Sequence, residues 1–317
     1  MQKIFVLLEL NDEEREAFKA AAGDNEIVFD NEKDKFMSNQ EADFFEDADV
    51  IIGQPKPHIL KSIPKLKWLQ IRSSGADKYL KPGVLPEGVV LTSATGAYGQ
   101  AVAEHTFAMM LGIMKLMPIY RDNQRASLWR DEGNALTPYG MDVLVIGTGD
   151  LGSSFAKYCK AFGAHTIGVR RDPSKAAEGI DEMHGLDEIG ELIRKADVIC
   201  SMIPYSEEMV KFFNYDRFMS MKKSAIFLNA GRGPIVDCDG LYKALEEGHL
   251  FGAGLDTLDP EPFPKEHPLW RQQRVFITPH TAGGDHIDLT VRRVNEIALN
   301  NLKAYLAGQP LKNVMNG

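Results

Sequence analysis

Two blocks of the chain alternate short apolar runs with segments of helical periodicity. In residues 1–98 the apolar runs lie at 4–8, 27–29, 50–53, 69–72 and 89–92, with helical patterns at 12–22 and 39–48. From residue 141 six further runs follow, at 143–146, 165–169, 198–203, 225–229, 252–255 and 275–277. Helical patterns at 151–162, 186–195 and 240–247 separate some of them. Such alternation is typical of parallel sheets covered by helices. It predicts two Rossmann-like α/β domains, a small flavodoxin-like one and a larger doubly wound one.

The segment 99–120 joins the two blocks and is the longest nonpolar stretch of the chain. It contains Glu104, His105 and Lys115, which make it a poor membrane span and favour a buried helix at an interface. A last helical pattern at 287–306 follows the final apolar run and could return the chain to the first block. We therefore expect one domain from 1–98 plus 285–317 and a second from 99–284.

A glycine-rich loop joins the run 143–146 to the helical pattern after it. Its residues are Gly147, Thr148, Gly149, Asp150, Leu151 and Gly152. The first glycine permits a tight turn, the second lets the backbone approach a pyrophosphate, and the third allows close helix–strand packing. The loop predicts a dinucleotide site at a helix N-terminus, and the alternative is an ordinary turn between strand and helix.

The residues after the run 165–169 bear on which dinucleotide is bound. An acidic residue there would bind the ribose 2′-hydroxyl of NAD. This chain has Arg170 and Arg171, whose guanidinium groups favour a 2′-phosphate, and Lys175 follows soon after. The pattern predicts a preference for NADP(H), with Asp172 in the NAD-binding role as the alternative.

Three polar residues, Arg232, Glu261 and His280, follow the last three apolar runs. Ligands of open α/β sheets bind beyond the carboxyl ends of the strands, so these runs predict one site assembled from distant segments. A guanidinium can bind an anion, an imidazole can move a proton, and a carboxylate can tune that imidazole. Taken singly, each residue also has a purely structural interpretation. Arg232 could cap the end of a sheet, Glu261 could lie on a solvated loop, and His280 could be one of eight ordinary histidines.

Several ordered motifs together give the chain a family resemblance. They are Ala101-Val-Ala-Glu-His105, the Gly147–Gly152 loop, Asn229-Ala-Gly-Arg-Gly233, Gly254-Leu-Asp256 with Asp259-Pro-Glu261-Pro, and Thr278-Pro-His280-Thr-Ala-Gly283. With them the chain resembles the D-isomer-specific 2-hydroxyacid dehydrogenases, which include glyoxylate/hydroxypyruvate reductases, D-lactate dehydrogenases and phosphoglycerate dehydrogenases. The resemblance implies an oxidoreductase that reversibly reduces a small 2-oxo acid to the D-2-hydroxy acid with NAD(P)H, in a cleft that closes between the domains.

The resemblance also implies roles for individual residues. Arg232 matches the arginine that binds the substrate, His280 the acid/base and Glu261 its carboxylate partner. Asp256 matches a second carboxylate near the nicotinamide. The remaining expected contacts with the cofactor come from Ile203, Pro204, Ala230 and Gly231. Where the family often has threonine, this chain has Ser206 and Met209, which affects side-chain but not backbone contacts.

The first block contributes a loop that matches the family's substrate-carboxylate loop. It contains Ser74, Gly75 and Ala76, whose backbone amides could converge on an anion. The alternative is a plain β-turn. Tyr98 could contact substrate or pack at the domain hinge.

Composition narrows the remaining classes of function. The chain of 317 residues is 44% hydrophobic and 26% charged, and its net charge of -9 argues against a nucleic-acid partner. Cys159, Cys200 and Cys238 lack the spacing of metal or redox sites, and residues 1–10 read as a first strand rather than a signal peptide. We expect a cytoplasmic enzyme without a metal and without membrane contact. The resemblance implies a homodimer, for which the helix 99–120 is the candidate contact.

Two other classes of protein share parts of this pattern. A dinucleotide-sensing corepressor of the same fold would have little or no turnover, although an intact Arg232, Glu261 and His280 argues against a purely structural role. A methyltransferase also has a glycine-rich loop, but that reading leaves the 2-oxo-acid residues unexplained.

Overall fold

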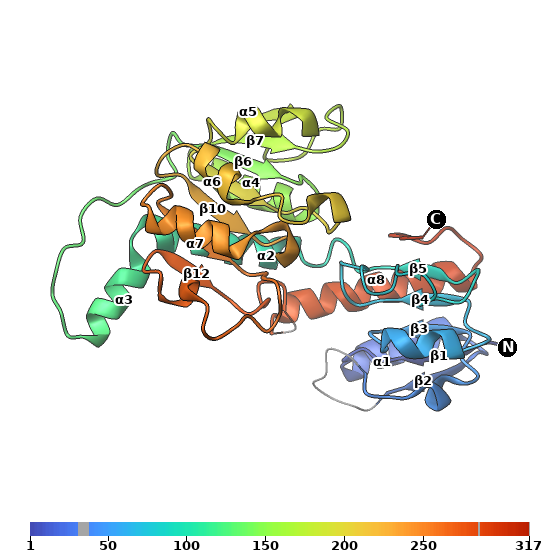
Figure 1. Ribbon diagram of the computed structural model, residues 1–317. Helices are drawn as coiled ribbons and strands as arrows, with labels where there is room; N and C mark the ends of the chain where they lie inside the picture. Colours follow the sequence, from blue (N-terminus) through green and yellow to red (C-terminus); the bar gives the residue numbers. More distant parts are fainter. Residues whose placement is uncertain (31–37, 285, 317) are drawn as a thin grey trace. The chain divides into compact units, whose positions relative to one another are not determined.

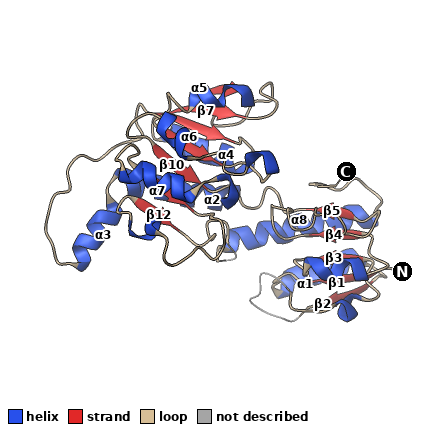
Figure 2. Ribbon diagram, viewed as in Figure 1, coloured by secondary structure: helices blue, strands red, loops and turns tan. Residues whose placement is uncertain are grey.

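The computed structural model describes residues 1–30, 38–284 and 286–316, which fold into two compact units. The first unit combines Met1–Tyr98 with Asp285–Gly317, and the second is Gly99–Gly284. Each unit has a parallel sheet with helices (Figures 1 and 2). The expected fold class of two Rossmann-like α/β units is confirmed.

The described strands of the first unit form a parallel sheet in the order β2-β1-β3-β4-β5, the flavodoxin-like arrangement. They are β1 (Lys3–Val6), β2 (Glu26–Phe29), β3 (Val50–Ile52), β4 (Trp68–Gln70) and β5 (Val90–Thr92). The helices are α1 (Asp12–Ala22) and α8 (Asp288–Leu306), with 3-10 turns η1 (Ala42–Phe45) and η2 (Pro57–Ser62).

Alternate residues of β1 supply both faces of this sheet. Ile4 and Val6 pack with Phe18 of α1 and Leu302 of α8, whereas Phe5 belongs to the cluster on the other face. This period of two is the reason that the short apolar runs could be identified as strands. The return of the chain through α8 completes the first unit.

The helix expected at 39–48 is wrong, because the structure has only the turn η1 there. Its two aromatic residues, Phe44 and Phe45, are adjacent rather than one helical turn apart. Both rings contact Phe5, with centroids 5.2 and 5.3 Å away. A single turn therefore buries the apolar groups of this segment without a longer helix.

The described strands of the second unit form a parallel sheet in the order β12-β11-β10-β9-β6-β7-β8. They are β6 (Asp142–Ile146), β7 (His165–Val169), β8 (Glu182–His184), β9 (Val198–Ser201), β10 (Ile226–Asn229), β11 (Gly252–Leu255) and β12 (Val275–Ile277). The direction of strand addition reverses between β6 and β9, where doubly wound folds bind their ligands. Strand β8 was not expected because this short edge strand has one apolar residue, Met183.

The helices of the second unit cover this sheet. They are α2 (Gly99–Met114), α3 (Met117–Arg125), α4 (Asp150–Ala161), α5 (Ile189–Leu192), α6 (Tyr215–Ser220) and α7 (Cys238–Glu246). Short 3-10 turns are η3 (Leu186–Glu188), η4 (Glu207–Met209), η5 (Gly233–Ile235) and η6 (Pro268–Arg271). Within the described residues, no helix is long and apolar enough to cross a membrane.

The single helix expected at 99–120 is also wrong, because the structure divides it into α2 and α3. Leu116 has a φ of 58°, a left-handed conformation that ends the helical path, and Pro118 lies in the first turn of α3. Proline is tolerated at that position because the first turn lacks intrahelical acceptors. Only α2 is largely buried, against α4 and β11.

Candidate active site

The carboxyl ends of three neighbouring strands carry the three polar residues that the sequence singled out. Strands β10, β11 and β12 are adjacent and parallel, so the segments after them begin at the same edge of the sheet. Arg232 follows β10, Glu261 follows β11 and His280 follows β12. The structure brings His280 and Glu261 into contact, with 3.0 Å between Nδ1 and Oε2.

The carboxylate of Glu261 is held from two sides. Its Oε1 accepts a hydrogen bond from the backbone N–H of Leu258 at 3.2 Å, and its Oε2 faces the imidazole of His280. This hydrogen bond is the main cause of a raised pKa of His280, which burial opposes. The charge of Asp256 raises that pKa further, and the charge of Arg232 lowers it. Since Nδ1 is engaged, proton exchange with a ligand is left to Nε2.

Close backbone packing joins the loop of Arg232 to the loop of Glu261. Gly233 has no room for a side chain, because a Cβ there would overlap the carbonyl group of Leu258. The buried amide of Asn229 makes a second link, donating to the carbonyl oxygen of Arg232 at 3.1 Å and to Thr257 Oγ1 at 3.0 Å. The two loops are therefore fixed to each other where they leave the sheet.

Asp256 holds the turn that carries His280. Its carboxylate accepts hydrogen bonds from Thr278 Oγ1 at 2.7 Å and from the N–H groups of Thr281 and Ala282 at 2.9 and 3.1 Å. Its carbonyl oxygen accepts the N–H of His280 at 2.8 Å. The side chain of Asp256 is buried in these contacts, and its expected position near a nicotinamide stays a prediction.

The glycine-rich loop packs closely at its first and third glycines and is open at its second. Gly147 has a φ of 97°, and a Cβ there would lie 2.8 Å from the carbonyl oxygen of Met202. A Cβ at Gly152 would overlap the carbonyl oxygen of Gly147. At Gly149, the exposed N-cap of α4, the Cβ position opens onto free space. The helix N-terminus is thus accessible to an anion, as the motif predicts.

The other residues of this loop differ in what they offer to a ligand. Asp150 and Leu151 lie in the first turn of α4. Thr148 is buried, and its hydroxyl donates to Met183 Sδ at 3.8 Å.

Basic residues follow β7 as the sequence indicates. Arg170 is half-buried and donates from Nη1 to the carbonyl oxygen of Lys175 at 3.2 Å, while Arg171 is exposed. Asp172 caps the same turn, accepting from Ser174 Oγ at 2.6 Å and from Ser174 N–H at 3.2 Å. These bonds lower the pKa of Asp172.

The loops after β9 and β10 also meet at this edge of the sheet. A Cβ at Gly231 would lie 2.7 Å from the carbonyl oxygen of Ile203, so these loops are in backbone contact. Ala230 is buried, Ile203 is half-buried and Pro204 is exposed. Their expected contacts with the cofactor remain predictions.

The expected substrate loop belongs to the first unit. Ser74 Oγ lies 3.3 Å from Thr95 Oγ1, Gly75 is half-buried and Ala76 is buried. The hydroxyl of Tyr98 donates to the carbonyl oxygen of Arg72 at 2.6 Å, which ties it to the beginning of this loop. Binding of substrate by these residues remains a prediction.

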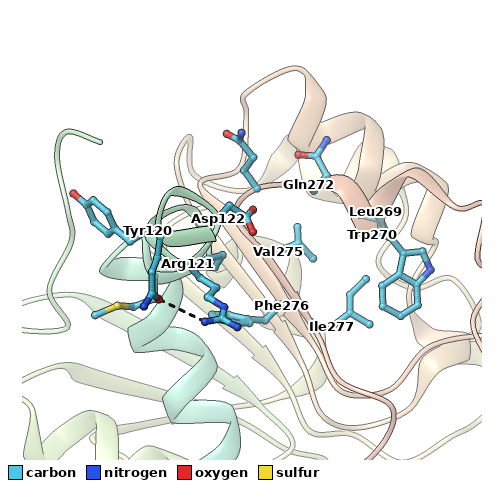
Figure 3. Close-up of a pocket in the computed structure, with 13 residues that line it drawn as sticks. Tyr120, Arg121, Asp122, Leu269, Trp270, Gln272, Val275, Phe276 and Ile277 are labelled. Atoms are coloured by element: carbon cyan, nitrogen blue, oxygen red, sulfur yellow. Dashed lines mark hydrogen bonds between the residues drawn. The ribbon is translucent and has the colours of Figure 1, made fainter. Parts of the chain in front are cut away.

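A pocket of about 600 Å³ lies elsewhere in the second unit (Figure 3). Tyr120, Arg121 and Asp122 of α3 line one side of it, and Trp270 and Phe276 belong to the other side. None of Arg232, Glu261 and His280 lines this pocket. The candidate active site at the strand ends is therefore separate from the hollow beside α3.

Sequence reasoning assigned no role to three polar residues that shape this site, Asn229, Thr278 and His105. Asn229 and Thr278 each come at the end of an apolar run. This position could have identified Asn229 and Thr278 from the sequence, since a polar group buried at a strand end needs hydrogen-bonding partners.

Comparison with known proteins finds one family over most of the second unit. The D-isomer specific 2-hydroxyacid dehydrogenase family, NAD binding domain, matches residues 107–282. Glyoxylate/hydroxypyruvate reductase B of Escherichia fergusonii is 29% identical over 290 residues, covering 87% of either chain. Among solved structures, a family protein from Aeromonas salmonicida aligns with a TM-score of 0.84 at 28% identity, over 99% of both chains. A D-isomer specific 2-hydroxyacid dehydrogenase from Xanthobacter autotrophicus, in complex with NADPH and MES, aligns with a TM-score of 0.81 at 25% identity, over 99% of this chain and 98% of that one.

Proposed function

Because the chain belongs to the D-isomer specific 2-hydroxyacid dehydrogenase family, we propose that it reduces a small 2-oxo acid to the D-2-hydroxy acid with NADPH. A nicotinamide-dependent 2-hydroxyacid dehydrogenase activity is what the family performs. The observation that carries the proposal is the contact of 3.0 Å between His280 and Glu261 at the ligand-binding edge of a doubly wound sheet, where Arg232 follows the adjacent strand β10. Glyoxylate and hydroxypyruvate are the substrates we favour, because the relative from Escherichia fergusonii is named for them.

In the proposed reaction, Arg232, His280 and Glu261 each have a different role, which follows from the charge of the side chain. Arg232 binds the carboxylate of the substrate and polarises its carbonyl group. His280 donates the Nε2 proton to the carbonyl oxygen as negative charge develops there, and takes it back in the oxidation direction. Glu261 stabilises the imidazolium and fixes the orientation of the ring. A nicotinamide dinucleotide, when bound, supplies the hydride for the carbonyl carbon.

The preference for NADPH is supported by the turn after β7. Asp172, the one carboxylate that could bind a ribose 2′-hydroxyl there, accepts two hydrogen bonds from Ser174. Arg170 and Arg171 place two guanidinium groups in the same turn. The structural relative from Xanthobacter autotrophicus holds NADPH.

A panel of 2-oxo acids with both cofactors tests this function. We expect oxidation of NADPH, followed by absorbance, with glyoxylate, hydroxypyruvate or pyruvate, and a lower kcat/KM with NADH.

Replacing both Arg170 and Arg171 by alanine removes charged hydrogen bonds, so the kcat/KM with NADPH falls roughly ten- to hundredfold while that with NADH is retained. Arg194→Ala, at an exposed position before β9, is the matched control.

The panel can also contradict the proposal. Equal or better use of NADH would reject the cofactor preference. Absence of turnover with every acid, together with a rise in melting temperature on adding NADPH, would instead favour a dinucleotide-sensing protein of the corepressor kind.

We also propose that the protein is a homodimer whose contact includes α3 and the pocket beside it. Within the expected contact 99–120, Ala101, Phe107, Met109, Met110 and Met114 are buried in their own unit and Leu111 is half-buried, so we keep only its last residues, from Met117, in the proposed contact. Exposed apolar side chains occur instead on α3 and in the segment after it, which extend away from the sheet of their unit (Figure 1). They are Met117, Tyr120, Leu128, Trp129 and Tyr139. A second copy of the chain is the occupant that the family resemblance implies.

A further inference from the structure

A hydrogen-bond network lies behind the turn of His280, and it begins on α2. His105 Nε2 is 3.0 Å from Thr278 Oγ1, and Thr278 Oγ1 donates to Asp256 Oδ1 at 2.7 Å. His105 Nε2 and Asp256 Oδ1 are 3.8 Å apart. One hydroxyl group therefore links α2 to the residues that follow β11 and β12.

The direction of this network follows from counting protons. A threonine hydroxyl has one proton to donate, and in Thr278 that proton is directed to the carboxylate of Asp256. Its oxygen must then accept from His105, so Nε2 of His105 carries a hydrogen. The network runs one way, from imidazole to hydroxyl to carboxylate.

The end point of the network is the backbone on both sides of His280. Asp256 binds the hydroxyl of Thr278 before it and the N–H groups of Thr281 and Ala282 after it. The turn that these contacts close gives His280 a φ of 54°. Left-handed backbone is unfavourable for a residue with a Cβ and persists only when surrounding contacts determine it.

We propose that His105 is a positioning residue for His280, acting through Thr278 and Asp256. By donating to Thr278, His105 fixes the hydroxyl that helps to close the turn. The closed turn then orients the imidazole of His280 toward Glu261. The inference rests on the proposed function, in which His280 exchanges the proton. It assigns a role to a half-buried polar residue of α2, a helix whose buried side chains are mostly apolar.

Kinetic comparison of two substitutions tests the proposal. His105→Leu removes the donor, and kcat for reduction is expected to fall about tenfold, while the KM for the acid and the Kd for NADPH change little. His105→Gln keeps an N–H donor near the Nε2 position and should restore most of the lost kcat. Glu104→Gln is the control on the same helix, because Glu104 is an exposed residue that accepts hydrogen bonds from Gln100 and Tyr158, outside this network.

Nuclear magnetic resonance of the His280 ring gives a readout that does not depend on turnover. The groups that act on this ring are Glu261 and Asp256, which raise its pKa, and Arg232, which lowers it. A displaced turn lengthens the bond to Glu261, so the pKa of His280 should fall in His105→Leu. Thr278→Val, which removes the hydroxyl at nearly constant volume, should have the same effect.

The outcomes separate this inference from the proposed function. A lower kcat and a lower pKa of His280 in His105→Leu and Thr278→Val, but not in Glu104→Gln, would support it. Unchanged kcat and unchanged titration in folded His105→Leu would overturn it. If the unaltered protein reduces none of the acids, the proposed function fails, and the titration of His280 still decides the positioning role. Should His105→Leu not fold, Thr278→Val decides in its place.

Discussion

His280 combines a costly backbone conformation with a side chain that the fold holds in place. A left-handed φ costs a residue with a Cβ roughly 1 kcal/mol, and hydrogen bonds of the turn to Asp256 offset it. In return the ring meets Glu261 at 3.0 Å. At this scale the sequence draws attention to His280 and Glu261, because each is a polar residue that follows an apolar run, and the structure brings the two side chains into contact. The sequence does not predict the hydrogen bond between Thr278 and Asp256, because these residues are 22 positions apart and meet only through the pairing of β11 with β12.

Glu261→Gln tests the electrostatic role of the carboxylate. The hydrogen bond to Glu261 raises the pKa of His280, so its loss lets that pKa fall toward the ordinary histidine value. Since the proposed reduction needs the protonated ring, the alkaline decline of kcat should move to lower pH. At neutral pH kcat should decrease roughly ten- to hundredfold, within what general acid catalysis contributes.

The measurement is kcat for 2-oxo-acid reduction across the neutral and alkaline range. Glu266→Gln, at an exposed position in the same segment, is the control and should keep the unaltered profile. An alkaline decline at the same pH in Glu261→Gln would show that another group sets the protonation of His280.

At the scale of elements, the site depends on loops that leave adjacent strands and touch through their backbones. Gly233 fits against Leu258 only because it has no side chain, and Gly231 fits against Ile203 for the same reason. The alternation of apolar runs predicts that these loops share an edge of the sheet. It does not predict which glycines touch, since that depends on loop paths that periodicity does not encode. The division of 99–120 into α2 and α3 was missed for a similar reason, because mostly apolar residues continue past Leu116 as far as Tyr120 and hide the break.

Gly233→Ala should disturb both stability and catalysis. The added Cβ would overlap the carbonyl group of Leu258, so the loops of Arg232 and Glu261 must separate. Overpacking of this kind costs about 1–3 kcal/mol of the free energy of unfolding. We expect a lower denaturation midpoint and a lower kcat, measured by chemical denaturation and by the reductase assay.

Gly190→Ala is the matched control for this substitution. A Cβ at Gly190, within α5, meets nothing within 4 Å, and alanine favours helix more than glycine does. Its stability should be equal or higher. An unaltered midpoint and kcat in Gly233→Ala would mean that the two loops can move apart at no cost.

At the scale of the whole molecule, the two sheets follow closely from the order of strands and helices along the chain. Right-handed crossovers between parallel strands leave few alternatives once the elements are known. The surface is harder to predict from sequence, because an exposed apolar residue and a buried one look the same in a pattern. Trp129 is an example. It is fully exposed in the segment after α3, and no periodicity in the sequence there distinguishes it from a buried core residue.

Trp129→Ser tests the proposed homodimer. We expect the unaltered protein to have the mass of a dimer at micromolar concentration by sedimentation, and this variant to dissociate more readily because it loses a large apolar contact. Phe162→Ser is the control, since Phe162 is an exposed aromatic residue at the end of α4. A monomeric mass for the unaltered protein would reject the dimer.

The strand order of the second unit separates two kinds of information within one sheet. The glycine-rich loop follows β6 and the basic turn follows β7, on one side of the reversal, whereas Arg232, Glu261 and His280 follow β10, β11 and β12 on the other. In the proposed function, the residues that would choose between NADP and NAD thus follow strands on one side of the reversal, and the residues that would exchange the proton follow strands on the other. Substitutions in the turn at 170–172 should therefore change the coenzyme preference without changing the residues proposed to exchange the proton.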